Sequence, residues 1–308
     1  MATAIGLIGA PTDIGAGMRG ASMGPEALRV AGIQTMLESQ GLVVSDQGNL
    51  GGPGNPWLPS RDGYRHLPEV VAWNQLVHAA VLGELQAARL PILLGGDHSL
   101  AIGSISAVAR HCRERKRKLR ILWLDAHADF NTPETSPSGN VHGMPVAMLC
   151  REPGLESVMG NIERVSVKPQ NVHLFGIRSV DRGERALLAA RGIHVADMRL
   201  IDEFGVVSSL KSILDEVQGR NGLLHVSLDV DFLDPSIAPG VGTPVPGGAT
   251  YREAHLIMEM LHDSGLVVSL DIVELNPFLD DRGRSAKILV DLAASLFGRS
   301  IVDRPQQA

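Results

Sequence analysis

Short apolar segments recur along the chain, and most of them end at or beside Gly or Asp. The apolar residues within each segment are mostly continuous rather than alternating. This pattern is typical of strands that are buried on both faces of a parallel sheet. The predicted strands are Ala4–Gly9, Leu90–Leu94, Ile121–Leu124, Val172–Gly176, Leu223–Leu228 and Val267–Ile272.

Patterns typical of helices lie between these strands. Pro25 opens the first helix, in the first turn where proline is tolerated, and Gly41 closes it. The other predicted helices are Glu69–Ala88, Leu100–Arg117, Asp181–Arg191, Val206–Val217, Thr250–His262 and Ser285–Leu296. Alternation of strands and helices along the whole chain predicts an α/β sheet. No linker, shift in composition or internal repeat interrupts it, so we expect one domain over residues 1–308.

Two segments of biased composition interrupt the alternation. The Gly- and Pro-rich segment Gly48–Pro59 is interpreted as an ordered surface loop. The basic segment Arg113–Lys118 is compatible with a nucleic-acid contact, but a solvated helix end is favoured because basic side chains suit the negative end of the helix dipole.

Charge and cysteine content narrow the class of protein. The 308 residues carry 28 Lys and Arg against 34 Asp and Glu, a net charge of −6, which argues against a nucleic acid or an anionic membrane as partner. Only Cys112 and Cys150 are present, so neither a disulfide framework nor a cysteine-based zinc site is expected. The N-terminus is interpreted as a strand rather than a signal peptide, and no apolar segment is long enough to span a membrane. A cytoplasmic protein is the expectation.

Aspartates cluster after three of the predicted strands, and in two of these clusters they occur together with histidine. Open α/β sheets bind ligands at the carboxyl ends of their strands, so these residues are candidates for a site. The three clusters contain Asp97 and His98; Asp125, His127 and Asp129; and Asp229, Asp231 and Asp234.

Alternation of side chains along an extended strand places Asp125, His127 and Asp129 on one side, and likewise Asp229 and Asp231. Carboxylates held together against an apolar background repel each other unless a cation lies between them. Four aspartates supply a charge of −4, which two divalent cations balance. Imidazole and carboxylate ligands suit Mn²⁺, Fe²⁺, Co²⁺ or Zn²⁺, and a pair of such ions generates hydroxide at neutral pH.

Other polar residues of these segments have a structural interpretation beside the functional one. Asp97 and Asp234 are the aspartates best explained as structural, since Asp97 is out of phase with a ligating His98 and Asp234 precedes a proline. By residue type alone, His142 is either a proton shuttle or an exposed loop histidine. Glu274 is either a cation-binding carboxylate or a turn residue.

Asp271 and Asn276, on either side of Glu274, are candidates for holding the local backbone.

Together, these motifs resemble the ureohydrolase family, and within it the arginases of bacterial type. The resemblance extends from about Ile5 to Gly298, including the N-terminal segment GAPTDIGAGMRGASMGPEALR. It is carried by GGDHS (95–99), DAHADFN (125–131), SGNVHGMP (138–145), SLDVDFLDP (227–235), GTPVPGG (242–248) and DIVELNP (271–277). It implies a three-layer α/β/α fold with a mostly parallel sheet of eight strands.

The resemblance also implies two Mn²⁺ ions per subunit. One would be held by His98, Asp125, Asp129 and Asp229, and the other by Asp125, His127, Asp229 and Asp231, so that Asp125 and Asp229 bridge. A hydroxide between the metals would attack the guanidinium carbon of L-arginine and yield L-ornithine and urea. Asp129 would accept a hydrogen bond from that hydroxide. Glu274 would orient the guanidinium with support from Thr243, and His142 would protonate the leaving amine.

Substrate choice within the family depends on the contacts to the amino-acid end of arginine. The loop 131–140 resembles the arginase loop, where Asn131, Ser136 and Ser138 match positions that contact the α-carboxylate. Asp181 and Glu184 match positions near the α-amino group. Asn140 completes the predicted substrate-binding set. The alternative is an agmatinase or another guanidino-acid ureohydrolase.

A protein that keeps the fold without catalysis is disfavoured, because all of the matching residues are present. The resemblance further implies a homotrimer or homohexamer.

Overall fold

The computed structural model describes residues 4–163 and 167–300, and its central feature is a sheet of eight strands in the order β2-β1-β3-β8-β7-β4-β5-β6. Every strand pair is parallel, so all of the carboxyl ends lie at one edge. The strands are β1 (Ala4–Gly9), β2 (Val43–Asn49), β3 (Leu90–Leu94), β4 (Lys118–Leu124), β5 (Val172–Ile177), β6 (His194–Asp197), β7 (Gly222–Asp229) and β8 (Val267–Val273).

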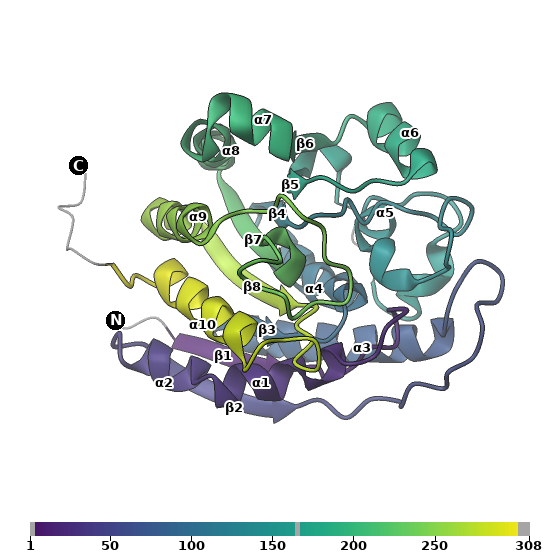
Figure 1. Ribbon diagram of the computed structural model, residues 1–308, viewed down its shortest axis with the longest axis horizontal. Helices are drawn as coiled ribbons and strands as arrows, with labels where there is room; N and C mark the ends of the chain where they lie inside the picture. The colour runs from purple at the N-terminus through teal and green to yellow at the C-terminus, as the bar shows by residue number, and fades with distance from the viewer. Residues whose placement is uncertain (1–3, 164–166, 301–308) are drawn as a thin grey trace.

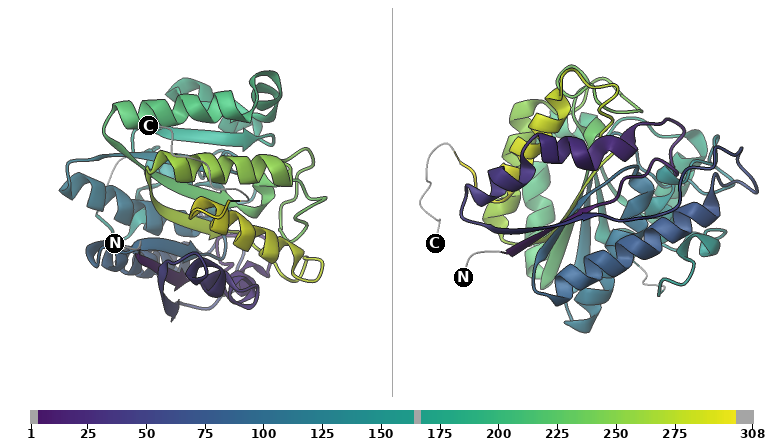
Figure 2. Two further views of the ribbon diagram at one scale, coloured as in Figure 1. Left: turned by 90° about the vertical axis from the view of Figure 1, so that its left-hand side faces the viewer. Right: turned by 90° about the horizontal axis from the view of Figure 1, so that it is seen from below.

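Helices cover both faces of the sheet and give three layers (Figures 1 and 2). The first face carries α3 (Leu67–Gln86), α4 (Ala101–Glu114), α5 (Pro145–Leu149) and α6 (Arg182–Arg191). The second carries α1 (Gly24–Val30), α2 (Ile33–Glu38), α7 (Met198–Phe204), α8 (Val206–Gly219), α9 (Tyr251–Ser264) and α10 (Arg284–Leu296). The predicted α/β/α class with eight strands is confirmed.

Two hydrophobic cores follow from the alternation of side chains along the central strands. In β4, Ile121 and Trp123 are buried in the core of the first face, whereas Leu122 and Leu124 are buried in the core of the second. A strand whose side chains point alternately into the two cores needs apolar residues at every position. This explains the continuous apolar segments in the sequence.

The six predicted strands are all present, with ends that differ by up to three residues. The two strands that the apolar pattern missed, β2 and β6, lie at the two edges of the sheet. Their residues are exposed or only partly buried, so no continuous apolar segment marks them.

The helix prediction is wrong at residues 25–41, where two helices stand in place of one. Gly32 has a φ of 88°, a left-handed conformation that interrupts the helix between α1 and α2. Helices α5 and α7 were not predicted. The basic segment Arg113–Lys118 runs from the end of α4 into the start of β4, consistent with the predicted helix end. Among the described residues, no helix is both long and apolar enough to cross a membrane.

The predicted site motifs follow strands that are neighbours in the centre of the sheet. Strand β3 precedes GGDHS, β4 precedes DAHADFN, and β7 and β8 run into SLDVDFLDP and DIVELNP. The order β3-β8-β7-β4 therefore brings the four motifs together at the carboxyl edge.

Gly96 has less space around it than Gly95, the other glycine of GGDHS. A Cβ atom built on Gly96 would lie 1.7 Å from the backbone carbonyl oxygen of Thr12, which belongs to the loop after β1. We expect Gly96→Ala to lower the free energy of unfolding by about 3 kcal/mol or more, because backbone rather than a flexible side chain must move. Urea unfolding measures the change. Gly51→Ala is the control, since Gly51 has no atom within 4 Å of such a Cβ; equal stability of the two variants would contradict the prediction.

Candidate functional site

A first group of potential metal ligands surrounds His98, which begins a 3₁₀ helix separated from the end of β3 by three residues. Its Nδ1 lies 3.0 Å from Asp125 Oδ2, 3.3 Å from Asp129 Oδ2 and 3.1 Å from Asp229 Oδ2. His98 is buried, yet this nitrogen has no hydrogen-bond partner. A buried imidazole nitrogen that faces three carboxylate oxygens without a hydrogen bond fits a cation shared by all four.

A second group shares Asp125 with the first. His127 Nδ1 lies 3.0 Å from Asp231 Oδ2 and 3.5 Å from Asp125 Oδ1. Asp125 thus turns one oxygen toward each histidine, as a bridging carboxylate does. In Asp229, Oδ1 accepts the backbone N–H of Asp231, which leaves Oδ2 for the first group.

The alternation argument that selected these residues does not describe their backbone. Strand β4 ends at Leu124, and Asp129 has a left-handed φ of 48°. Asp231 lies in the 3₁₀ helix Val230–Phe232 rather than in β7. The side chains converge because the chain turns sharply after each strand. The prediction therefore named residues that do come together, but the extended strand from which it was argued is not present there.

Two further residues hold these ligands, and the sequence analysis did not identify them. Trp123 stacks on the His98 ring with a centroid distance of 3.9 Å and donates from Nε1 to Asp125 Oδ2 at 2.9 Å. Ser227 Oγ lies 2.8 Å from His98 Nε2, which fixes the ring with Nδ1 toward the carboxylates. Trp123 and Ser227 each precede an aspartate of the first group by two residues, and this spacing is the sequence signal that could have identified them.

Asp97 and Asp234 have structural roles, as predicted. Asp97 is buried and accepts the backbone N–H groups of Gly15 and Ser99. Asp234 accepts the backbone N–H groups of Ser236, Gly247 and Gly248. A hydrogen bond with the Ser236 side chain, together with these backbone bonds, lowers the pKa of Asp234 to about 2.

The electrostatics of the aspartates show an unbalanced cluster of negative charge. Burial raises the pKa of Asp129 and Asp229 well above its usual range, and the neighbouring aspartates raise it further. The pKa of Asp125 is lowered: burial opposes this, but the neighbouring imidazoles of His127 and His98 outweigh it. Because the cluster is destabilised by its own charge, divalent cations would relieve a repulsion already built into the fold.

His142 and Glu274 form a pair beside the first group. His142 Nδ1 lies 2.8 Å from Glu274 Oε1, which also accepts the backbone N–H of His98 at 2.8 Å. Glu274 has a left-handed φ of 64°, so its side chain leaves the line of β8 and enters the site. The pKa of Glu274 is lowered by His142 against the effect of burial, and that of His142 is raised by Glu274 against the effect of burial. The pair therefore combines an anion with a proton donor.

A pocket of about 220 Å³ opens over these groups. Its lining includes all the predicted catalytic and substrate-binding residues, which are Asp129, Asn131, Ser136, Ser138, Asn140, His142, Asp181, Glu184, Thr243 and Glu274. His98, His127 and Asp229 also face the pocket, whereas Asp125 and Asp231 lie buried behind it. Residues from six separate segments thus meet in one cavity.

The loop 131–140 presents hydroxyl groups to the pocket. Ser136 Oγ accepts the backbone N–H of Gly139, and Ser138 Oγ accepts that of Asn140. Each hydroxyl keeps its own hydrogen, so both serines are free to donate to an anion.

Asp181 and Glu184 lie at the same pocket. Asn131 Nδ2 donates to Asp181 Oδ2 at 3.0 Å, while Glu184 accepts the backbone N–H groups of Phe130 and Asp181. Burial raises the pKa of Glu184 to about 7.

Two supporting roles differ from the expectation. The Thr243 hydroxyl donates to Asp231 Oδ2 at 3.0 Å rather than to Glu274. Asp271 does not hold backbone: it accepts the Ser104 hydroxyl at 2.7 Å and faces buried His225. Asn276 does hold backbone, through the carbonyl of Arg19 and the N–H of Phe278.

Comparisons with known proteins agree with this geometry. The model of the Arginase family matches residues 3–298. The arginase of Brucella melitensis is 52% identical over 97% of this chain and 97% of the relative, and that of Bacillus caldovelox is 42% identical over 97% and 99%. The solved structure of the Bacillus caldovelox arginase aligns with a TM-score of 0.91 at 41% identity, covering 98% of this chain and 100% of the other. That of the Bacillus subtilis arginase aligns with a TM-score of 0.90 at 40% identity, covering 97% and 100%.

Proposed function

This chain belongs to the arginase family, and from that premise we propose that it hydrolyses L-arginine to L-ornithine and urea with two Mn²⁺ ions per subunit. Membership makes it a hydrolase that acts on the guanidino C–N bond of arginine. The proposal of L-arginine as substrate and of two metal ions is supported by the lining of the pocket. Glu274, residues of the aspartate cluster and the hydroxyl-bearing loop 131–140 all line it.

The residues fit a pair of divalent cations. His98, Asp125, Asp129 and Asp229 would hold one ion, and Asp125, His127 and Asp231 the other. The family resemblance implies that Asp229 would also bind the second ion, sharing Oδ2 between the two. Two imidazoles with four carboxylates are a ligand set suited to Mn²⁺. When bound, the two cations would lower the pKa of a water molecule and so supply a nucleophile at neutral pH.

Glu274 is the group that would hold the guanidinium. Its carboxylate is buried at the pocket wall and its pKa is lowered, so it stays anionic and attracts a planar cation. Its hydrogen bonds to the His98 N–H and to His142 fix the carboxylate in place before the substrate arrives.

His142 is placed to supply the proton of the leaving group. Hydrolysis transfers the oxygen of a water molecule to the guanidinium carbon, the C–N bond to the side chain breaks, and the departing amine takes a proton. With Nδ1 bonded to Glu274, His142 has Nε2 available to give that proton. The carboxylate of Glu274 stabilises the imidazolium from which it comes.

The amino-acid end of the substrate has partners of matching charge. The free hydroxyl hydrogens of Ser136 and Ser138 suit the α-carboxylate of arginine. Asp181 and Glu184 suit its α-amino group, and Asn131 holds Asp181 in position. Agmatine lacks the α-carboxylate and would leave the two serines without their ligand, so the loop favours arginine.

The experiment compares urea released from L-arginine and from agmatine by the Mn²⁺-loaded protein, with a chelator-treated control. We expect urea from arginine, lost on chelation, and at least about tenfold less from agmatine, since the hydrogen bonds to the carboxylate are missing. Urea from agmatine alone would overturn the assignment of Ser136, Ser138 and Asp181 while leaving the metal site in place. Urea from neither substrate with the loaded protein would overturn the proposed activity.

Assembly as a homotrimer or homohexamer stays a prediction of the family resemblance, and a cytoplasmic location stays a prediction from the N-terminal sequence and the two cysteines. Mass measurement of the purified protein in solution tests the first.

A further inference from the structure

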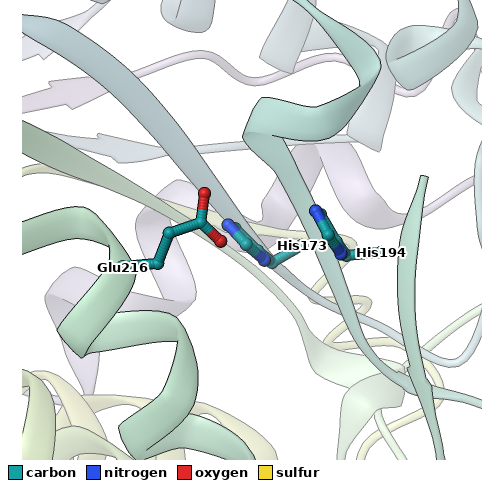
Figure 3. Close-up of side chains that lie close together, drawn as sticks. All are labelled: His173, His194 and Glu216. Carbon is teal, nitrogen blue, oxygen red and sulfur yellow. The ribbon is translucent and has the colours of Figure 1, made fainter. Parts of the chain in front are cut away.

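A second cluster of metal-ligating side chains lies outside the pocket, toward the amino ends of the strands. It consists of His173 in β5, His194 at the start of edge strand β6, and Glu216 in α8. None of the three lines the pocket described above. Figure 3 shows the His173 ring between the Glu216 carboxylate and the His194 ring.

Strand register explains why the two histidines meet. His173 and His194 are paired positions of parallel strands β5 and β6, so their side chains leave the same face of the sheet. Their rings stack with a centroid distance of 4.9 Å and an interplanar angle of 15°. One potential ligand atom from each of the three residues lies within 4.8 Å of the others.

His173 has an unused ligand atom. Its side chain is buried, with the residue only 3% exposed, and Nε2 has no hydrogen-bond partner. An unpaired buried nitrogen costs free energy, so a partner is to be expected. Burial lowers the pKa of His173 to about 4, which keeps the imidazole neutral and its lone pair free for a metal. A pocket of about 300 Å³, lined by all three residues, gives access.

The charges around Glu216 restrict which ions can bind. Arg120 and Arg220 both contact Oε1, at 3.4 and 3.3 Å, and leave Oε2 for a further ligand. Because these guanidinium groups offset the carboxylate charge, binding must rely on the imidazole nitrogens rather than on attraction to negative charge. Zn²⁺ satisfies this requirement far better than Mn²⁺, Mg²⁺ or Ca²⁺.

We infer that His173, His194 and Glu216 form a second metal site, which takes one imidazole-preferring divalent ion such as Zn²⁺. Tetrahedral coordination at about 2.0–2.1 Å places ligand atoms about 3.4 Å apart, so the three side chains must move closer together. The His194 ring must also rotate out of its stack on His173, because a metal lies in the plane of each imidazole that binds it. His194 is exposed and the Glu216 side chain is 27% exposed, so both can rotate toward buried His173. Water from the pocket fills the fourth position. The ion ties edge strand β6 to β5 and to α8.

Metal counting tests the site on the full chain. The protein is loaded with Mn²⁺, equilibrated with Zn²⁺ by dialysis, and analysed for total metal per chain. His194→Ala and Glu216→Gln each remove one proposed ligand, and His262→Ala removes an exposed histidine of α9 as a matched control. We expect both ligand variants to bind one ion fewer than the unaltered protein and the control. Counting total metal keeps the comparison valid even if Zn²⁺ replaces Mn²⁺ in the pocket.

Hydrogen exchange supplies a second readout. Zn²⁺ should slow exchange of the β6 backbone amides in the unaltered protein and in His262→Ala, but not in His194→Ala. Equal total metal in all four proteins would overturn the second site. An exchange rate of the β6 amides that Zn²⁺ does not change in the unaltered protein would also overturn it. Neither outcome bears on arginine hydrolysis, which is measured separately with Mn²⁺ alone.

Discussion

Asp125→Ala should lose both Mn²⁺ ions and nearly all hydrolysis of arginine. Asp125 turns Oδ2 toward His98 and Oδ1 toward His127, so one substitution removes a ligand from each metal group. It also removes one of the four negative charges that balance two divalent cations. We expect the rate to fall by about 10⁴-fold or more, which corresponds to about 5 kcal/mol of transition-state stabilisation.

Manganese content per chain after dialysis, measured beside urea release, checks this expectation. Asp215→Ala is the control, because Asp215 is an exposed aspartate of α8 that pairs only with Lys211 among the ion pairs of the described residues. The control should keep both ions and full activity. Full manganese content in Asp125→Ala would show that Asp125 does not bridge the two groups.

His142→Ala should keep both Mn²⁺ ions and lose mainly turnover. His142 contacts Glu274 and lies in no metal group, so its removal leaves the ligands in place. Loss of a proton donor to the leaving amine costs about 10²–10⁴-fold in kcat. KM should change much less. The His98 N–H still fixes the Glu274 carboxylate, which therefore still binds the guanidinium.

Measuring kcat and KM of His142→Ala and of the unaltered protein over a range of pH tests whether His142 donates a proton or only packs against its neighbours. We expect added imidazole to restore part of the lost turnover in His142→Ala, since a small base can enter the space left by the side chain. His262→Ala, changed at an exposed histidine of α9, should behave as the unaltered protein. A kcat for His142→Ala that matches the unaltered protein at every pH would rule out the shuttle.

The sequence indicated the central strands of the fold well and its edges poorly. Strands β3, β4, β7 and β8 are buried on both faces, so their apolar segments are continuous and visible. Strands β2 and β6 have only one neighbouring strand each, and their mixed exposure hides them. The break between α1 and α2 depends on the conformation of a single glycine, Gly32, which composition does not reveal.

For the site, the sequence alone identified which residue types follow which strands. Asp125, His127, Asp129, Asp229 and Asp231 were selected by their position after buried strands, and this holds because parallel strands share one carboxyl edge. Their common orientation was inferred from an extended backbone, whereas turns at Asp129 and Asp231 produce it. His142 and Glu274 could not be separated from loop residues by residue type; the family resemblance was needed.

Only the tertiary structure decided the partners of these residues. Four such contacts join different segments of the chain. They are the stack of Trp123 on His98, the bond of Ser227 to His98 Nε2, the bond of Thr243 to Asp231, and the pairing of His173 with His194. A sequence pattern records periodicity and local spacing, which determine where a strand ends and which side chains it offers. Contacts between strands depend on their order and register in the sheet, and these are set by the packing of the whole chain.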